Sequence, residues 1–125
     1  MRIILAGLLL GVSSLSGAAG PITAGEFLAR AEPLMQKSKM ALLFSSEAKA
    51  LMKIAGETAQ RNRARLDAER AAGRPVRTCL PPKGKARMDA KELLAYLRAL
   101  PPQQRSESFD LAFGGYAAKK YPCRG

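Results

Sequence analysis

Apolar residues recur along this chain at the three- and four-residue spacing that places them on one face of a helix. The clearest run precedes the Pro101-Pro102 pair and consists of Leu93, Leu94, Leu97 and Leu100. Asp89 and Glu92 open this run with the spacing of a capping box, and Met88 and Leu93 have the spacing of a hydrophobic staple. No alternating apolar and polar run competes as a strand. The sequence therefore predicts an all-α fold, a small four-helix domain.

The first predicted helix begins near residue 24. Thr23 and Glu26 have the spacing of another capping box, and Ile22 and Phe27 sit at the two positions of a staple around it. Pro33 either kinks this helix or ends it, because proline lacks the amide hydrogen that a continuing helix needs. If the helix continues past the kink, its buried stripe consists of Phe27, Leu28, Ala31, Leu34 and Met35.

A longer second helix is predicted to begin at Ser45 or Ser46 and to end at Ala72, before a capping glycine and a proline that prevents continuation. Its first half can bury a face that consists of Leu51, Met52, Ile54 and Ala55. The apolar cluster just before it is expected to be core and consists of Leu42, Leu43 and Phe44. The second half is expected to project into solvent, because Leu66 is its one large apolar residue.

The last predicted helix runs from about Gln104 to Tyr121, where Pro122 ends it. Its apolar face consists of Phe109, Ala112, Phe113, Tyr116 and Ala117. Gly114 and Gly115 interrupt this helix and cost about 1 kcal/mol each relative to alanine. Close approach of another helix is the usual reason for such glycines, and a local break is the alternative.

The N-terminus has the parts of an export signal. Arg2 supplies a positive charge, the next ten residues are almost wholly apolar, and a stretch of small residues follows. Cleavage is expected after Ala18 or Ala19, which makes residues 1–19 a signal peptide and residues 20–125 a single α-helical domain. A retained membrane anchor is the alternative, but the apolar stretch is shorter than the roughly 20 residues of a spanning helix. The protein is predicted to be periplasmic or secreted.

The chain has two cysteines, Cys79 and Cys123, and no histidine. An exported protein enters an oxidising compartment, where such a pair predicts a disulfide rather than a metal site or a thiol enzyme. The bond would close residues 79–123 into a hairpin of the last two helices, and a loop of about 45 residues adds up to ~4 kcal/mol of stability on the chain-entropy model. A redox pair is the alternative, but it would need neighbouring cysteines such as C-x-x-C.

Short motifs frame these two cysteines and the helices between them. Cys79-Leu80-Pro81-Pro82 opens the frame, Leu93-Leu94-Ala95-Tyr96-Leu97 leads to Pro101, and an alanine-rich helix ends in Lys120-Tyr121-Pro122-Cys123. In the order and separation of these motifs, the C-terminal half of the chain resembles the Rap/Tai immunity proteins. These are small periplasmic helical inhibitors of type VI secretion cell-wall amidases. The resemblance implies a helical protein that binds and blocks such an amidase.

The chain is strongly basic, with 21 lysines and arginines against 10 acidic residues. Residues 61–91 hold ten of the basic residues and three of the acidic ones. The candidate partner-binding residues in this segment are Arg61, Arg63, Arg65, Arg70, Arg74, Arg77, Lys83, Lys85 and Arg87. Such a segment predicts docking to an acidic protein, an anionic envelope surface or nucleic acid. Nucleic acid is the weakest of these partners, because the segment has no aromatic residue on which a base could stack.

A solvated helix surface is the alternative interpretation of this basic segment. Three oppositely charged pairs have i,i+4 spacing, namely Glu57 with Arg61, Arg63 with Asp67, and Arg65 with Glu69. Each such pair stabilises a helix by only ~0.2–0.5 kcal/mol. A run of charges is then an ordinary solvated face rather than a binding site.

The sequence offers no constellation for catalysis. Without histidine there is no ordinary catalytic triad, and with both cysteines bonded there is no thiol nucleophile. Asp89 and Glu92 are assigned to capping, and Glu107 and Asp110 to the outer face of a helix. No catalytic residue, cofactor or metal ligand is predicted, and the protein is not expected to be an enzyme.

Two functions remain for an exported helical domain that acts by binding. The first is an immunity or inhibitor-like protein whose partner is an acidic protein or a cell-wall enzyme. The second is a cationic envelope protein that associates with anionic cell-wall polymer or membrane surface. The sequence leaves the oligomeric state open, a homodimer included.

The exported protein should carry a Cys79–Cys123 bond and no free thiol, because the chain has no other cysteine. Intact mass combined with thiol labelling checks this, and two accessible thiols in the native protein would contradict it. Reduction should lower the melting temperature substantially and leave the helical circular-dichroism signal recognisable, since the bond acts mainly on the unfolded chain.

Overall fold

The structure is a computed structural model that describes residues 21–124, so the predicted signal peptide at residues 1–19 lies outside the described residues. Within residues 21–124 the chain forms helices and no strand, which confirms the all-α class. The helices are α1 (Ala24–Ala31), the 3-10 helix η1 (Glu32–Gln36), α2 (Lys39–Leu43), α3 (Ser46–Ala71), α4 (Ala90–Ala99), α5 (Pro102–Arg105) and α6 (Phe109–Lys120). The predicted number of four is too low, because no separate helix was predicted for residues 39–43 or for residues 102–105, which form α2 and α5.

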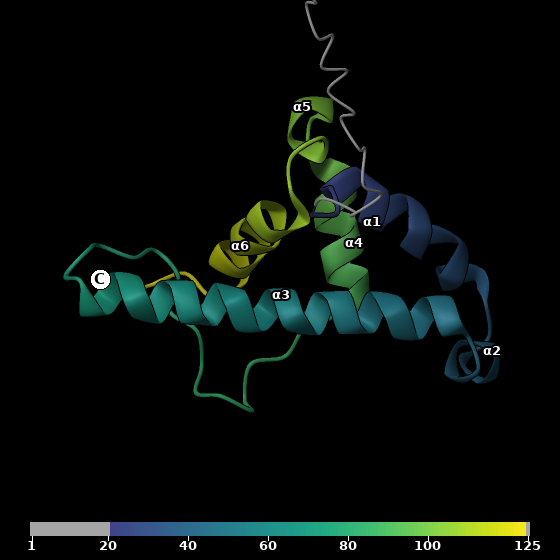
Figure 1. Cartoon of the computed structure of the whole chain (residues 1–125), viewed down its shortest axis with the longest axis horizontal. Coiled ribbons are helices and arrows are strands. Elements are labelled where there is room, and N and C mark those ends of the chain that lie inside the picture. The colour runs from purple at the N-terminus through teal and green to yellow at the C-terminus, as the bar shows by residue number, and fades with distance from the viewer. Residues whose placement is uncertain (1–20, 125) are drawn as a thin grey trace, which may run out of the picture.

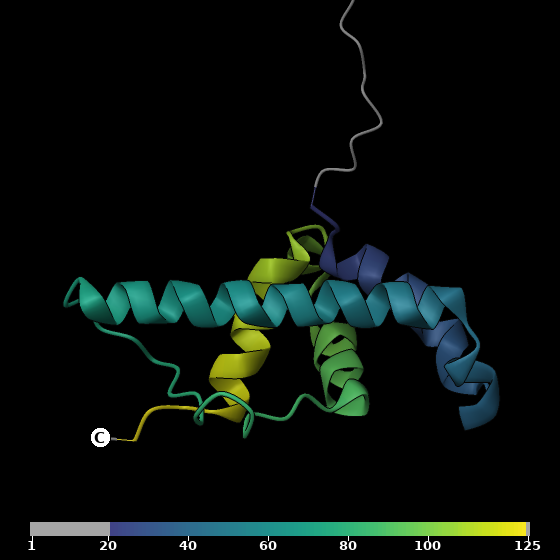
Figure 2. The same ribbon diagram turned by 60° about the horizontal axis from the view of Figure 1, so that its bottom comes forward.

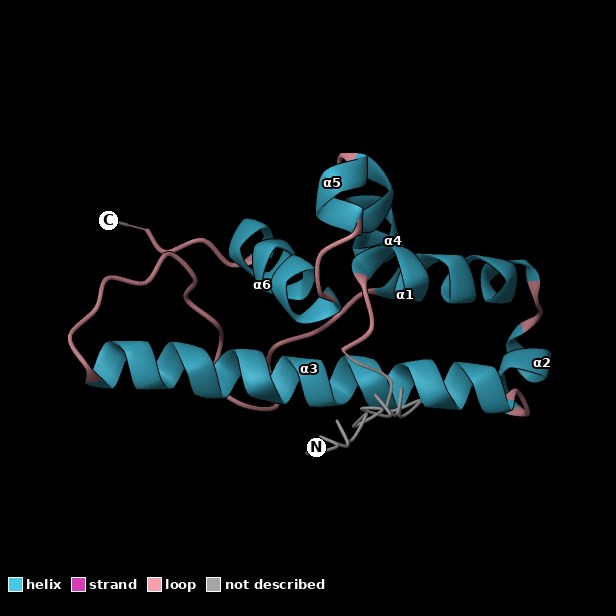
Figure 3. Ribbon diagram, turned by 45° about the horizontal axis from the view of Figure 1, so that its top comes forward, coloured by secondary structure: helices cyan, strands magenta, loops and turns pink. Residues whose placement is uncertain are grey.

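Helix α3 runs along the whole length of the molecule, and α1, α4 and α6 pack on one side of it (Figures 1 and 2). Helices α1, α4 and α6 also contact one another, so the core lies where these three meet α3. The short helix α5 turns the chain between α4 and α6 at the end farthest from α3 (Figure 3).

Aromatic stacking joins the first helix, α1, to the last helix, α6, in this core. Phe109 of α6 is completely buried, and its ring stacks on that of Phe27 of α1 with 4.0 Å between the centroids. Phe113 contacts Phe109 edge-on at 6.0 Å, and Tyr116 contacts Phe113 in the same way at 5.8 Å. Such edge-on pairs add to the free energy of apolar burial. The predicted apolar face of the last helix is thereby confirmed.

The start of α1 is paired with the start of α6. The Ala24 amide donates to the carbonyl of Glu107 at 2.9 Å, and the Phe109 amide donates to the carbonyl of Ile22 at 2.8 Å. Each helix has its own side-chain cap beside this pair. The Thr23 hydroxyl accepts from the Glu26 amide, as the predicted capping box requires, and Ser108 caps α6.

Proline fixes the end of α1 and the start of α5. Helix α1 ends at Ala31, and Pro33 continues the chain in the first turn of η1, so Leu34 remains in the core and Met35 packs against it. The predicted last helix is wrong at its start, because the chain forms α5 after Pro101 and begins a new helix at Phe109. The predicted start near Gln104 is too early because Ser108 caps α6, and this cap sets the first residue of the helix at Phe109.

Helix α3 has the predicted bounds, with Ser45 as its N-cap and Gly73 at a φ of 73° just after its end. Two predictions of burial near its start are wrong. Met52 is 72% exposed, and Leu43 and Phe44 of the predicted core cluster are 66% and 79% exposed. The physical reason is that the chain forms a separate five-residue helix, α2, beside α3, and none of the residues of α2 is buried by the described part of the chain.

Gly114 and Gly115 lie in an unbroken helix, so close approach is the correct explanation of the pair. A Cβ at Gly115 would collide with the hydroxyl oxygen of Tyr96 from α4. A Cβ at Gly114 would lie 3.3 Å from the Arg65 guanidinium of α3. The two glycines therefore let α6 approach side chains of both neighbouring helices.

The predicted disulfide between Cys79 and Cys123 is present, with 4.8 Å between the two Cα atoms. Backbone hydrogen bonds support it on both sides. The Cys79 amide donates to the carbonyl of Tyr121 at 2.8 Å, and the Cys123 amide donates to the carbonyl of Arg77 at 3.0 Å. The bond therefore holds the loop after α3 against the segment that follows α6.

Alanine substitutions at two helical glycines should have opposite effects on stability. Gly56→Ala in α3 should raise the free energy of unfolding by about 0.5–1 kcal/mol, because a Cβ there meets no atom within 4 Å. Gly115→Ala should lower it by about 1 kcal/mol, because the Tyr96 ring must move. Urea unfolding of both variants checks this. Tyr96→Phe should recover part of the Gly115→Ala loss, and no recovery would show that the hydroxyl is not the obstacle.

Candidate binding site at the basic loop

The loop between α3 and α4, residues 72–89, contains five of the nine candidate binding residues and is called the basic loop here. It leaves the end of α3, runs back beside that helix and reaches the start of α4 (Figure 3). The five basic side chains on it are all exposed, and they are Arg74, Arg77, Lys83, Lys85 and Arg87.

Side chains from α3 and from the C-terminal segment hold the basic loop in place. Arg63 donates to the carbonyl of Pro81 at 2.9 Å, and Arg70 donates to the carbonyl of Thr78 at 2.6 Å. At its other end, the Tyr121 hydroxyl accepts from the Arg87 amide at 3.1 Å and donates to the Arg87 carbonyl at 3.2 Å. Together with the disulfide, these bonds give the loop one defined conformation.

The prediction that the second half of α3 projects into solvent is therefore wrong for one side of the helix. Asn62 and Leu66 are buried there, while most other residues between Ala59 and Gly73 are exposed. The sequence contains the donors to the basic loop, Arg63 and Arg70, but their acceptors are loop carbonyls, which carry no sequence signal.

Arg61 and Arg65 serve the fold rather than a free surface. Arg61 forms a two-bond ion pair with Asp110 of α6, with nitrogen–oxygen distances of 2.7 and 2.8 Å. Thr58 donates its hydroxyl to the same carboxylate at 3.1 Å. Arg65 bonds to Glu69 and to Asn62. Of the three predicted i,i+4 pairs, the one with Arg65 is confirmed, whereas Arg61 and Arg63 have partners outside their own helix.

These contacts shift the ionisation of the Arg61–Asp110 pair. The hydrogen bond from Arg61 lowers the pKa of the Asp110 carboxyl, although partial burial acts in the opposite direction. The hydrogen bond to Asp110 likewise raises the pKa of Arg61. Both side chains are about half exposed, so solvent screens the pair and its contribution to stability is modest.

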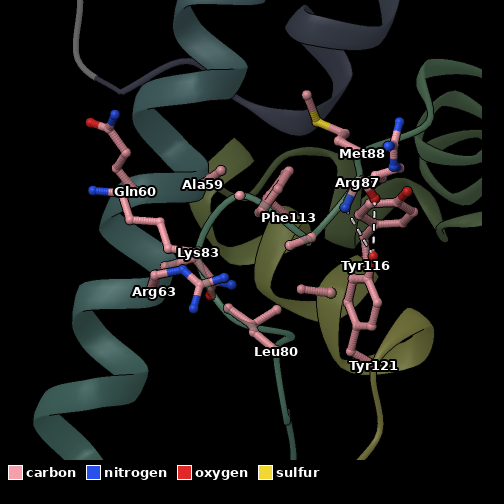
Figure 4. A pocket seen from close by; sticks show the side chains of 14 residues that line it. Ala59, Gln60, Arg63, Leu80, Lys83, Arg87, Met88, Phe113, Tyr116 and Tyr121 are labelled. Carbon is pink, nitrogen blue, oxygen red and sulfur yellow. Dashed lines mark hydrogen bonds between the residues drawn. The ribbon is translucent and has the colours of Figure 1, made fainter.

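A pocket of about 210 Å³ lies between the basic loop, α3 and α6 (Figure 4). Its apolar lining consists of Ala59, Leu80, Ala86, Met88, Phe113, Tyr116, Ala117 and Tyr121. Arg63, Lys83 and Arg87 bring three positive charges to it, and Gln60 adds an amide. We call this site the basic-loop pocket. Its combination of an aromatic interior and a cationic rim can hold an apolar side chain beside a carboxylate.

Tyr116 links this pocket to α4. Its hydroxyl accepts from the Asp89 amide at 3.4 Å and donates to the Glu92 carboxylate at 3.2 Å. Burial raises the pKa of Tyr116. Glu92 also pairs with Lys120 at 2.8 Å, and this hydrogen bond raises the pKa of Lys120. These groups fix the start of α4 beside the pocket.

The nine predicted binding residues do not form one surface. The basic-loop pocket brings together Arg63, Lys83 and Arg87. Arg61 and Arg65 line a separate hollow beside α6, and Arg77 lies beside the disulfide in a third. The apolar part of the pocket was not predicted, although Leu80 directly follows Cys79 and Tyr121 lies two residues before Cys123 in the motifs that frame the two cysteines.

Three further observations bear on function. Comparisons of the chain with protein-family models, curated proteins and solved structures give no match. Among residues 21–124, no three Cys, Asp or Glu side chains gather where they could hold a metal ion. In the same range, none of the helices has the length and apolar character to cross a membrane.

The Arg61–Asp110 pair should stabilise the protein above about pH 4 and lose this effect in acid. A folded-state pKa below the unfolded value means that the contribution is lost as the pH falls through the folded pKa. Asp110→Asn should therefore flatten the fall in melting temperature between about pH 5 and pH 2. At pH 7, Arg61→Gln should lower the melting temperature by about 2–4 °C.

Lys85→Gln is the matched control for this experiment. It also removes one positive charge, but from an exposed loop residue that forms no ion pair with residues 21–124. Its melting temperature should equal that of the unsubstituted protein at each pH. An equal loss in Arg61→Gln and Lys85→Gln would show that net charge, rather than the contact between α3 and α6, sets the effect.

Proposed function

We propose that this protein is an exported helical binding protein that inhibits a cell-wall amidase, and that the basic-loop pocket is its contact site. The supporting observation is an aromatic pocket inside a cationic rim, on a loop that a disulfide and four side-chain hydrogen bonds hold in place. The resemblance of the C-terminal half to Rap/Tai immunity proteins supplies the class of partner.

The pocket favours a specific protein contact over simple attraction of charge. Protein interfaces take most of their binding energy from a few apolar or aromatic anchors that fill well-packed pockets. Leu80, Phe113 and Tyr121 provide such a receptor, and its rigidity reduces the entropy that binding would otherwise cost. A purely cationic surface needs no pocket.

The rim favours a partner that brings an acidic residue. Lys83 and Arg87 form no ion pair with residues 21–124, so their charges are available to a carboxylate. Such a contact accelerates association and selects against basic partners. The proposed contact is therefore an apolar side chain next to an Asp or Glu on the surface of the amidase.

Association with an anionic envelope polymer is the second candidate. It rests on a different hollow, beside the disulfide, which Arg77, Lys119 and Arg124 line without any acidic side chain. Attraction at such an open surface depends on charge alone, and salt screens exposed charges beyond about 8 Å at physiological ionic strength. The two functions thus differ in how salt affects binding.

The double variant Lys83→Gln/Arg87→Gln should weaken inhibition of an amidase encoded next to this gene by about tenfold, because it removes both free charges of the rim. Leu80→Ala should weaken it by at least as much, since it removes part of the apolar receptor. Peptidoglycan hydrolysis in the presence of the protein measures both effects. Between 50 and 500 mM salt, the affinity of the unsubstituted complex should fall by no more than about tenfold.

The matched control is Lys119→Gln/Arg124→Gln, which removes two charges from the hollow beside the disulfide. This variant should inhibit the amidase normally. If it lost binding while Lys83→Gln/Arg87→Gln did not, and if binding vanished at high salt, the polymer-binding function would replace the proposed one.

A further inference from the structure

An apolar hollow of about 440 Å³ lies near the other end of α3, about twice the volume of the basic-loop pocket. It is bounded by α1, η1, α2, the first two turns of α3 and the start of α4. Met35, Met52 and Met88 line it together with leucine, alanine and phenylalanine side chains, and Lys49 is the one charged residue among the described residues of its lining. We call it the methionine groove.

The methionine groove joins the hydrophobic core to the surface. Leu51, Leu93 and Leu94 form its buried floor, while Leu43 and Met52 on its edge are about two-thirds exposed or more. Met40 on α2 and Phe44 directly after it are also large apolar residues that are mostly exposed. A monomeric protein rarely exposes so many large apolar side chains in one place unless they meet a partner.

The shape of the groove suits a helix. Its lining on α3 runs from Ala48 to Ala55, two helical turns or about 10 Å, and α2 and the start of α4 provide the other walls. A concave site of this length accepts side chains that project at i, i+3, i+4 and i+7 from one face of a partner helix. Methionine side chains adapt to different apolar shapes, which favours such a helix-in-groove contact.

The charged residues beside the groove indicate the charge that a partner should carry. Lys49 lines the groove, Lys53 follows one turn later on α3, and both side chains are exposed. Neither forms an ion pair with residues 21–124. Arg30 neutralises Glu47, whereas Asp89 accepts the Lys91 and Glu92 amides and forms no ion pair with residues 21–124. Two lysines against this one carboxylate leave a net positive charge beside the groove.

We propose that the methionine groove binds the apolar face of an acidic amphipathic helix of a partner protein. A second copy of this chain fits the observations less well, because a two-fold contact would bring the lysines of both copies into one interface. A lipid surface also fits less well, because the apolar side chains surround a concavity rather than forming a convex face that could enter a membrane.

Two designed peptides of 16 residues test this proposal on the exported protein. Both carry leucine at i, i+3, i+4 and i+7, and they differ in having glutamate or lysine on the polar face. Fluorescence anisotropy at physiological salt should show the glutamate peptide binding at least tenfold more tightly than the lysine peptide. Equal affinities, or no binding of the glutamate peptide, would overturn the proposal.

Substitutions locate the bound peptide. Met52→Asp should weaken binding of the glutamate peptide by at least tenfold, because it places a negative charge against both the apolar face and the glutamates of the peptide. Leu111→Asp is the matched control, since Leu111 is also an exposed large apolar residue but lies on α6 outside the groove, and it should bind normally. Lys49→Glu/Lys53→Glu should reduce the preference for the glutamate peptide about tenfold or more, whereas Arg124→Glu should leave it unchanged.

The remaining outcomes exclude other occupants and separate this proposal from the proposed function. Sedimentation should show a monomer, and a dimer that Met52→Asp dissociates would assign the groove to a second copy. Displacement of the peptide by phosphatidylglycerol vesicles would assign it to lipid, and binding that requires removal of residues 1–20 would assign it to the N-terminal segment of the chain. Loss of peptide binding in Lys83→Gln/Arg87→Gln would place the peptide in the basic-loop pocket and overturn only the inference about the groove.

Discussion

The stacking of Phe27 on Phe109 is the contact on which the rest of the structure depends. Helices of eight to twelve residues are marginal by themselves in water, so α1, α4 and α6 persist only because they bury their apolar faces against one another and against α3. Phe109 lies at the meeting point of these faces and is completely buried. Truncating such a ring removes packing from several helices at once, which makes its loss more costly than that of a peripheral side chain.

A second constraint organises the surface. The disulfide and the hydrogen bonds of Arg63, Arg70 and Tyr121 keep the basic loop against α3 and α6. A flexible cationic loop would lose conformational entropy on binding, whereas this one presents its pocket already formed. The methionine groove differs in this respect, because α2 is short and its outer face is open. The two sites therefore combine a rigid receptor with an adaptable one on a single long helix.

The sequence was sufficient to predict elements with strong local signals. Caps at Thr23, Ser45 and Asp89 placed three helix starts correctly, because each side chain acts on an amide within the next three residues. The disulfide was also predictable, because a chain with two cysteines has one possible pairing. What the sequence could not show depends on distant partners. Arg61 pairs with Asp110 of α6 rather than with Glu57, which is closer in the sequence. Leu43 and Met52 are exposed because no other described element packs over them.

The pairing of the Thr23 and Ser108 segments has a consequence for the order in which the protein folds. Its two backbone bonds join residues near the beginning of the described chain to residues more than 80 positions later. The ribosome synthesises α1 long before residues 107–109, so these two hydrogen bonds at the start of α1 cannot form until synthesis is nearly complete. Contacts of such long range close slowly. The nascent chain therefore lacks this contact until its last quarter has been synthesised.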